Sequence, residues 1–153
     1  MPTNPYWLNP VAAPEDSGIM YLRRTVSFDT PYADVVGGAN TYGVPIGAME
    51  AGCVPLYCHV TIETAFNAAT TNVLVVGTVD DDDGFATTAG TVPGTVGFKG
   101  NQTGALTGIP LASNKVVYVK YTQTGTAATT GKATVVMTFA NKQEVEGIAF
   151  PAN

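Results

Sequence analysis

Charged residues are scarce in this chain of 153 amino acids. Asp, Glu, Lys and Arg make up 12% of it, with seven Lys and Arg against twelve Asp and Glu. Binding a nucleic-acid backbone needs clustered cations, so the net charge of −5 argues against nucleic acid as a partner. A surface with few charges instead favours association with other protein chains, because small uncharged side chains lose little solvation when they pack.

The sequence also lacks a recognisable targeting or membrane-spanning segment. Residues Met1 to Pro5 contain no basic region followed by an apolar run, so we expect no secretory signal peptide. No window approaches the ~18 apolar residues of a membrane span. We therefore expect a protein that is made and kept in a cytoplasm and has no membrane as a partner.

Cysteine and histidine are too few for a disulfide framework or a zinc site. Cys53 and Cys58 should stay thiols in a reducing cytoplasm. A regular strand would put them on opposite faces, unless Pro55 between them breaks its geometry. His59 is the only histidine, and Cys-x4-Cys has no second pair of ligands. We predict no metal or other cofactor at these residues.

Groups for nucleophilic catalysis are missing as well. The three serines lie in no elbow or triad-like context, and the side chain of His59 should point away from that of Cys58 on a strand. His59 and Glu63 share a strand face but lie about 13 Å apart along it, too far for an acid–base pair. We predict that the protein is not an enzyme.

One dense run of charge, Asp80-Asp81-Asp82-Asp83 followed by Gly84, raises the possibility of a Ca²⁺ site. Its match to an EF-hand loop is poor, because Val79 fills the first ligand position and Gly90 stands where the closing Glu should be. Charge runs are usually solvated. We therefore expect a solvated hairpin tip and keep these four aspartates as a weak calcium candidate.

Small and β-branched residues are abundant. The chain contains 22 Thr and 17 Gly. Thr suits the pleated surface of a sheet and Gly suits tight turns, so this composition favours an all-β domain. At 153 residues the chain has the size of a single domain.

Four prolines within residues 1–18 prevent a regular helix or ladder there, so we predict an extended, Pro-rich N-terminal arm. The arm carries the aromatic and apolar cluster Tyr6-Trp7-Leu8, with the only Trp of the chain. This cluster is our candidate for binding a neighbouring partner subunit, and folding back over its own domain is the open alternative. Residues 19–153 should form a single β domain.

Period-two alternation predicts the strands of that domain. Even positions from Cys58 to Phe66 should face inward, and residues 73–78 should pair with that strand. Residues 115–141 should form a hairpin whose two strands point one apolar face each into the core. The full set of predicted strands is 19–28, 45–51, 57–66, 73–78, 95–99, an edge piece over 105–111, the two hairpin strands, and 145–150.

About eight strands at this spacing, with no long helical period, are typical of a β-sandwich of jelly-roll type. A barrel remains possible, and the strand order cannot be read from the sequence. No internal repeat indicates a propeller or solenoid.

The segment from Thr61 to Thr78 also resembles a known family. Its aromatic-ended strand, the run Asn67-Ala68-Ala69-Thr70-Thr71-Asn72 and the following Val73-Leu74-Val75-Val76-Gly77-Thr78 are similar to short β-rich virion proteins of tailed bacteriophages, among them capsid decoration (cement) proteins. The resemblance covers roughly residues 45–83 and, more loosely, the C-terminal hairpin.

This resemblance implies a non-enzymatic structural protein on the capsid surface of a virion, synthesised in the host cytoplasm. Its partners would be the major capsid protein and further copies of itself, in a dimer or trimer. A tail or head-fibre component would look much the same. A glycan-binding β-sandwich is the alternative from another class, since exposed aromatics beside acidic or amide groups can stack on sugars; the residues for that role would be Trp7, Tyr32, Tyr42, Asp34 and Asn40.

Overall fold

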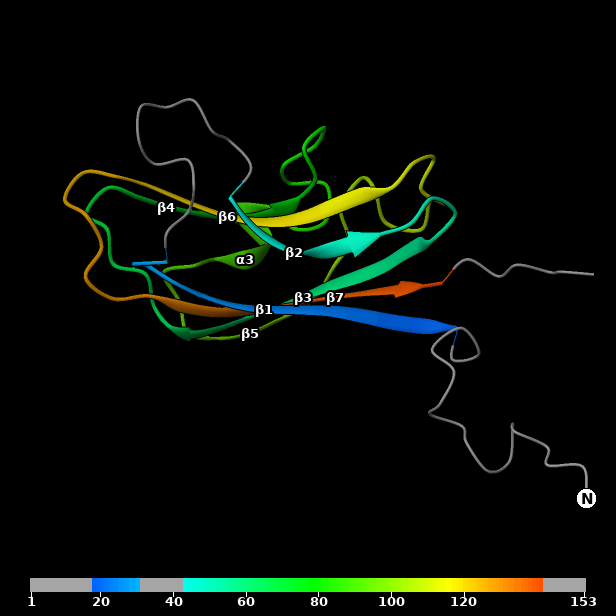
Figure 1. Cartoon of the computed structure of the whole chain (residues 1–153). Helices are drawn as coiled ribbons and strands as arrows, with labels where there is room; N and C mark the ends of the chain where they lie inside the picture. The colour runs from blue at the N-terminus through cyan, green and yellow to red at the C-terminus, as the bar shows by residue number, and fades with distance from the viewer. Residues whose placement is uncertain (1–17, 31–42, 142–153) are drawn as a thin grey trace, which may run out of the picture.

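The computed structural model describes residues 18–30 and 43–141, which form an all-β sandwich of two antiparallel sheets (Figure 1). The four-stranded sheet has the order β1 (Ile19–Ser27), β7 (Lys132–Ala140), β3 (Val54–Thr64), β5 (Gly97–Gln102). The three-stranded sheet has the order β2 (Val44–Met49), β6 (Lys115–Thr124), β4 (Thr71–Gly77). In the described residues α3 (Thr88–Thr91) is the only helix. The predicted all-β class is confirmed.

Successive strands along the chain alternate between the two sheets. Two predicted pairings are therefore wrong. The strand at 73–78, which is β4, pairs with β6 and not with β3, and the strands of the predicted hairpin at 115–141, β6 and β7, lie in different sheets. The connections over residues 65–70 and 125–131 are long enough to cross the ~10 Å between packed sheets. The alternation of apolar and polar residues predicts which face of a strand is buried. It does not show whether the next strand pairs in the same sheet or crosses to the other one, because both arrangements give the same alternation.

The buried faces themselves were predicted well. The two strands of the supposed hairpin face each other across the sandwich and bury Val117, Val119, Tyr121, Ala133, Val135, Met137 and Phe139. On β3 the inward positions Cys58, Val60 and Ile62 are buried, as is Phe66 beyond its end. Thr64, predicted to face inward, is exposed, because the ladder to β7 shifts register between Ile62 and Thr64.

A second register shift explains why both cysteines are buried. Both thiols are free and buried, although a regular strand would separate them onto opposite faces. The ladder between β3 and β7 shifts between Pro55 and Tyr57. A proline has no N–H to donate to a ladder and is found at such irregularities. At Pro55 the regular alternation of inward and outward side chains is therefore interrupted.

The two crossing connections lie against each other at one end of the sandwich. The Asn67 carboxamide oxygen accepts hydrogen bonds from the backbone N–H groups of Thr129 (2.8 Å) and Thr130 (3.0 Å). Gly131, at φ 148°, lies under the ring of Phe66, where a Cβ would come within 2.3 Å of that ring. Phe66 also contacts the ring of Tyr121, with centroids 4.4 Å apart. These contacts fix where the chain passes from one sheet to the other.

Residues 105–111, predicted as an edge strand, form turns instead. The backbone N–H groups of Gly108 and Leu111 donate to the carbonyls of Pro55 (2.7 Å) and Cys53 (2.9 Å), so the segment is attached at the start of β3 without forming a ladder. The predicted strand at 145–150 and the N-terminal arm lie outside the described residues.

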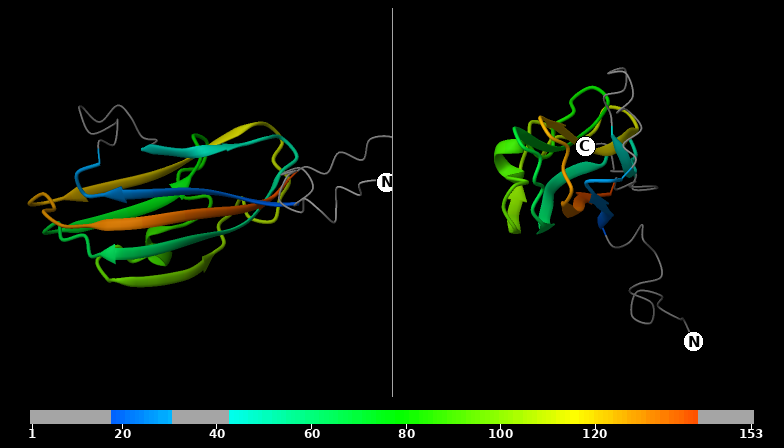
Figure 2. Two further views of the ribbon diagram at one scale, coloured as in Figure 1. Left: turned by 60° about the horizontal axis from the view of Figure 1, so that its bottom comes forward. Right: turned by 90° about the vertical axis from the view of Figure 1, so that its left-hand side faces the viewer.

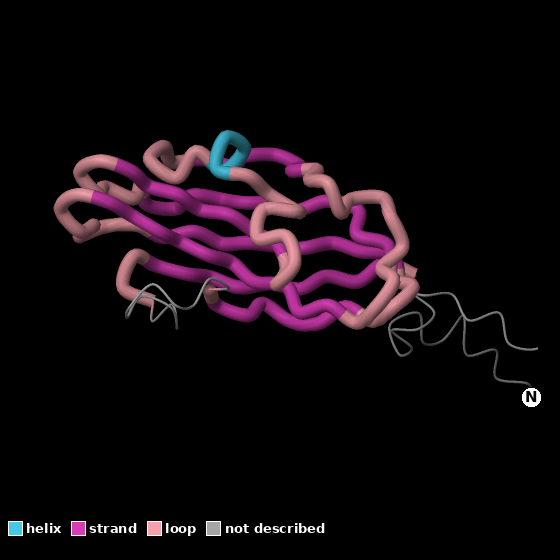
Figure 3. Tube along the Cα trace, turned by 90° about the horizontal axis from the view of Figure 1, so that it is seen from above, coloured by secondary structure: helices cyan, strands magenta, loops and turns pink. Residues whose placement is uncertain are grey.

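The two long sides of the sandwich are closed differently (Figure 3). On one side α3 packs against β4 and β5, where the buried Thr91 hydroxyl donates to the Leu74 carbonyl at 2.8 Å. On the other side β1 and β2 meet directly, with Leu22 over Gly47, where a Cβ would come within 2.7 Å of the leucine. The outer edge of β1 therefore ends the four-stranded sheet with no further strand beside it in the described residues.

Replacing Phe139 with Ala should lower the free energy of unfolding by about 3–5 kcal/mol, since the side chain is 3% exposed in the core and its loss leaves a cavity. Denaturant unfolding measures this difference. The matched control is Val116→Ala on the outer face of β6, where the cost should stay within about 0.5 kcal/mol. A loss below about 1 kcal/mol for Phe139→Ala would contradict the inward assignment of β7.

Candidate functional site

The outer face of the four-stranded sheet belongs to the larger of the two sheets. Its four strands lie side by side in Figure 2 (left). The register aligns three rows of outward side chains across them. One row holds Tyr21, Thr138 and Tyr57, the next Arg23, Val136, His59 and Asn101, and the third Thr25, Thr134, Thr61 and Phe98.

Aromatic rings form a connected cluster in the half of this face over β3 and β5. The ring of His59 stacks on that of Tyr57, with centroids 4.8 Å apart and an interplanar angle of 27°, and meets Phe98 edge-on at 5.2 Å. The His59 ring also hydrogen-bonds the side chain of Asn101. Phe98 is 62% exposed, and Tyr21 at the other edge of the sheet is 70% exposed. Large apolar side chains this exposed and this ordered are typical of a contact surface.

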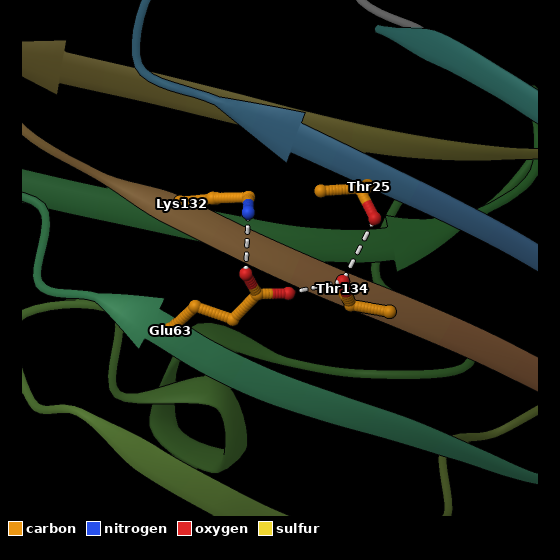
Figure 4. A network of polar contacts seen from close by, with 4 residues as sticks. All are labelled: Thr25, Glu63, Lys132 and Thr134. Carbon is orange, nitrogen blue, oxygen red and sulfur yellow. Dashed lines mark hydrogen bonds and ion pairs between the residues drawn. The ribbon is translucent and has the colours of Figure 1, made fainter.

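A polar network joins three strands in the other half of the face (Figure 4). Thr134 donates to a Glu63 carboxylate oxygen at 2.6 Å, and Lys132 bonds the second oxygen at 2.7 Å. Because the single hydroxyl proton of Thr134 is used there, the Thr25 hydroxyl donates to Thr134 at 2.8 Å. The network links β1, β7 and β3 and keeps this half of the surface polar.

Hydrogen bonds from Lys132 and then Thr134 hold the pKa of the Glu63 carboxyl below its ordinary value. The carboxylate is therefore the form that the fold stabilises, and it balances the Lys132 ammonium on the surface. Arg23, which also lowers the Glu63 pKa from a greater distance, has no ion pair among the described residues.

The acidic turn lies over the outer face of the other sheet. Asp80 forms an ion pair with Lys115, and Asp82 with Lys120 at 2.8 Å. Burial, followed by a hydrogen bond with Asp83, raises the pKa of the Asp81 carboxyl. Asp80, Asp82 and Asp83 are exposed. No group of three or more His, Cys, Asp or Glu side chains that could hold a metal occurs in the described residues, so the weak calcium candidate gains no ligand set.

Cys58 offers no activated thiol. Burial raises the pKa of Cys58 to about 12, so its thiol stays protonated at neutral pH. His59, its neighbour in sequence, is engaged on the opposite face of the strand with Tyr57, Phe98 and Asn101. This arrangement agrees with the prediction that the two side chains point apart.

Several candidate residues from the sequence fall outside the described part of the chain. These are the partner-binding candidates Tyr6, Trp7 and Leu8 and the sugar-binding candidates Trp7, Tyr32, Tyr42, Asp34 and Asn40. The sequence did not indicate the aromatic cluster, because Tyr57 and His59 meet Phe98 only through the pairing of β3 with β5. The one available signal was that two aromatic rings occupy successive outward positions of the predicted strand at 57–66.

Comparison with known proteins gives a similarity in fold and none in sequence family. No protein-family model and no curated protein matches this chain. Among solved structures, a chain in the capsid asymmetric unit of cyanophage Pam1 has a similar fold, with a TM-score of 0.51 and 19% sequence identity. The likeness covers 80% of this chain and 84% of that chain. At this identity it shows a shared fold, one that occurs in a phage capsid.

Within the described residues, no helix is long and apolar enough to cross a membrane.

The Glu63 network should make stability depend on pH. A carboxyl whose pKa is lowered by folding contributes stability above its unfolded pKa, near 4.5, and loses that contribution as the pH falls through the folded value. The difference in unfolding free energy between wild type and Glu63→Gln should therefore be larger at pH 7 than at pH 3. Denaturant unfolding across this range tests it, and a difference independent of pH would contradict the network.

Proposed function

We propose that this protein is a non-enzymatic structural component of a phage virion, most specifically a capsid decoration (cement) protein that binds the major-capsid lattice. The observation that carries the proposal is the likeness in fold, over most of both chains, to a chain of a phage capsid. The virion-protein resemblance of residues 61–78 supports it independently of the structure. A head-fibre or tail component belongs to the same class, and finding the protein on another part of the particle would favour it.

The winding of the chain supports a jelly roll. Strands alternate between the sheets from β1 to β7, and the last strand returns to lie between the first and the third. Such a chain folds back across itself in the manner of a double-sheet roll. The position next to β4, where an eighth strand would complete the second sheet, is occupied by the isolated bridge between Val76 and Ala86 and by α3.

The outer face of the four-stranded sheet is the surface that we assign to the lattice. Its cluster of Tyr57, His59 and Phe98 presents rings that stand against one another, and such rings can interdigitate with the side chains of a protein partner. A sugar would stack on an open ring face, and the stacked rings of Tyr57 and His59 each cover one face of the other. The glycan-binding alternative is therefore less well supported at this surface.

Self-association is the second part of the proposal. The chain has few charges to keep copies apart, and decoration of a symmetric lattice favours closed homo-oligomers such as a dimer or trimer. The N-terminal arm, with Tyr6, Trp7 and Leu8, is proposed as an additional anchor on a neighbouring subunit.

Phe98→Ala should weaken binding to capsids that lack this protein by about thirtyfold, the effect of removing an aromatic anchor worth about 2 kcal/mol. Phe98 is 62% exposed, so its loss should leave the melting temperature nearly unchanged. Val116→Ala is the matched control, because Val116 is 38% exposed but lies on β6 in the other sheet. Co-sedimentation with capsids measures both variants. Equal binding by the two would exclude the aromatic cluster as the contact.

Deleting residues 2–16 should leave the sandwich folded and weaken its hold on capsids, because the arm contributes the Tyr6-Trp7-Leu8 anchor. Thermal unfolding checks the fold and co-sedimentation checks the binding. Unchanged affinity would show that the arm takes no part in attachment. A large fall in the melting temperature would show that it packs on its own domain.

A further inference from the structure

The two sheets of the sandwich carry opposite charge. The strands of the four-stranded sheet hold one carboxylate, Glu63, and four cations, which are Arg23, Arg24, Lys99 and Lys132. With Asp29 in the turn after β1, the balance on this side is four cations against two carboxylates. The three-stranded sheet has Lys115 and Lys120 on β6, against the four carboxylates of the acidic turn at 80–83. The described part of the chain is therefore polarised, with its positive side at the four-stranded sheet.

Arg23 is an exposed cation on the outer face of this sheet, next to the aromatic cluster. Lys132 is bound by Glu63 at 2.7 Å, whereas Arg23 forms no ion pair in the described residues and acts on Glu63 only from a distance. Arg23 shares a row with Val136 and His59. Two strand spacings of about 4.8 Å place its backbone about 10 Å from that of His59. The unpaired guanidinium and the aromatic rings therefore belong to one surface.

We propose that this face binds an acidic surface of the capsid shell, with a partner carboxylate on Arg23 and apolar partner side chains against Phe98. Arginine binds a carboxylate through two parallel N–H···O bonds, and arginine and aromatic residues are enriched at the cores of protein interfaces. The inference rests on the proposed function and adds to it the chemistry of the partner. Because complementary potentials steer an approaching protein, the polarised sandwich would also turn this face toward an acidic shell before contact.

An acidic protein surface fits this face better than nucleic acid or a second copy of the chain. A phosphate backbone needs several clustered cations, and here Lys132 is already neutralised by Glu63. The ring of Phe98, which is 62% exposed, calls for an apolar contact beside the charge. A second copy would have to offer its acidic turn, where Asp80 and Asp82 already bind lysines.

Arg23→Glu should weaken binding to DNA-free capsids that lack this protein by at least about tenfold, because the partner carboxylate would then face a charge of its own sign. Arg23→Lys keeps the charge without the paired N–H groups, so its affinity should lie between those of wild type and Arg23→Glu. Lys115→Glu is the matched control. It changes the net charge by the same amount but lies on the other sheet, so its effect should stay within about twofold.

Co-sedimentation measures the affinities, and the melting temperature of each variant checks the fold. Since Arg23 is exposed, its replacement should leave the melting temperature nearly unchanged. Wild-type binding should also weaken between about 0.1 M and about 1 M salt, where the screening length falls from about 10 Å to about 3 Å. Arg23→Glu should reduce this salt dependence, whereas Phe98→Ala should lower the affinity and leave the salt dependence in place.

The possible failures of this inference and of the proposed function can be told apart. Binding that depends on Phe98 but not on Arg23 or on salt would overturn the acidic partner and leave the proposed function standing, whereas a wild type that does not bind capsids would remove both. Equal losses for Arg23→Glu and Lys115→Glu would show only an effect of net charge and contradict the inference. It would also be wrong if duplex DNA bound as tightly and with the same dependence on Arg23, or if light scattering showed a wild-type oligomer that Arg23→Glu converts to a monomer.

Discussion

The pairing of β7 with both β1 and β3 is the constraint on which the rest of the structure depends. Its odd-numbered residues from Ala133 to Phe139 enter the core, and its even-numbered residues form the middle of the outer face. A slip of one residue would exchange the two sets. The same register therefore fixes the packing against β6, the Glu63 network and the spacing of the aromatic rings across the sheet.

The sequence predicts the buried faces better than the connections. Val117, Val135 and their neighbours alternate so regularly that their burial could be expected without a structure. The pairing of the strands could not be predicted in the same way, because the sequences of residues 65–70 and 125–131 are compatible both with hairpin turns and with connections between sheets. The contacts that decide it, Asn67 with Thr129 and Phe66 over Gly131, join segments more than sixty residues apart.

The same limit applies to the candidate surface. Tyr57 and His59 were recognisable as outward residues of one strand, but their contact with Phe98 needs the β3–β5 pairing, which leaves no local signal. Helix α3 was missed because it has only four residues, with Thr87 as its cap, and no apolar period. The acidic turn was visible at once, whereas its two lysine partners on β6 became apparent only once β4 was found beside that strand.

The low charge of the chain and the exposed ring of Phe98 on the four-stranded sheet both fit the proposed place in a shell. A protein that is part of a shell gains from surfaces that are cheap to desolvate, and here three surface lysines are each paired with a carboxylate. The central claim is that the outer face of the four-stranded sheet meets the capsid. Cryo-electron microscopy of the virion tests it most directly: we expect this fold on the shell with Tyr57, His59 and Phe98 against the major capsid protein, and a map that left this face open to solvent, or particles that lacked the protein, would contradict it.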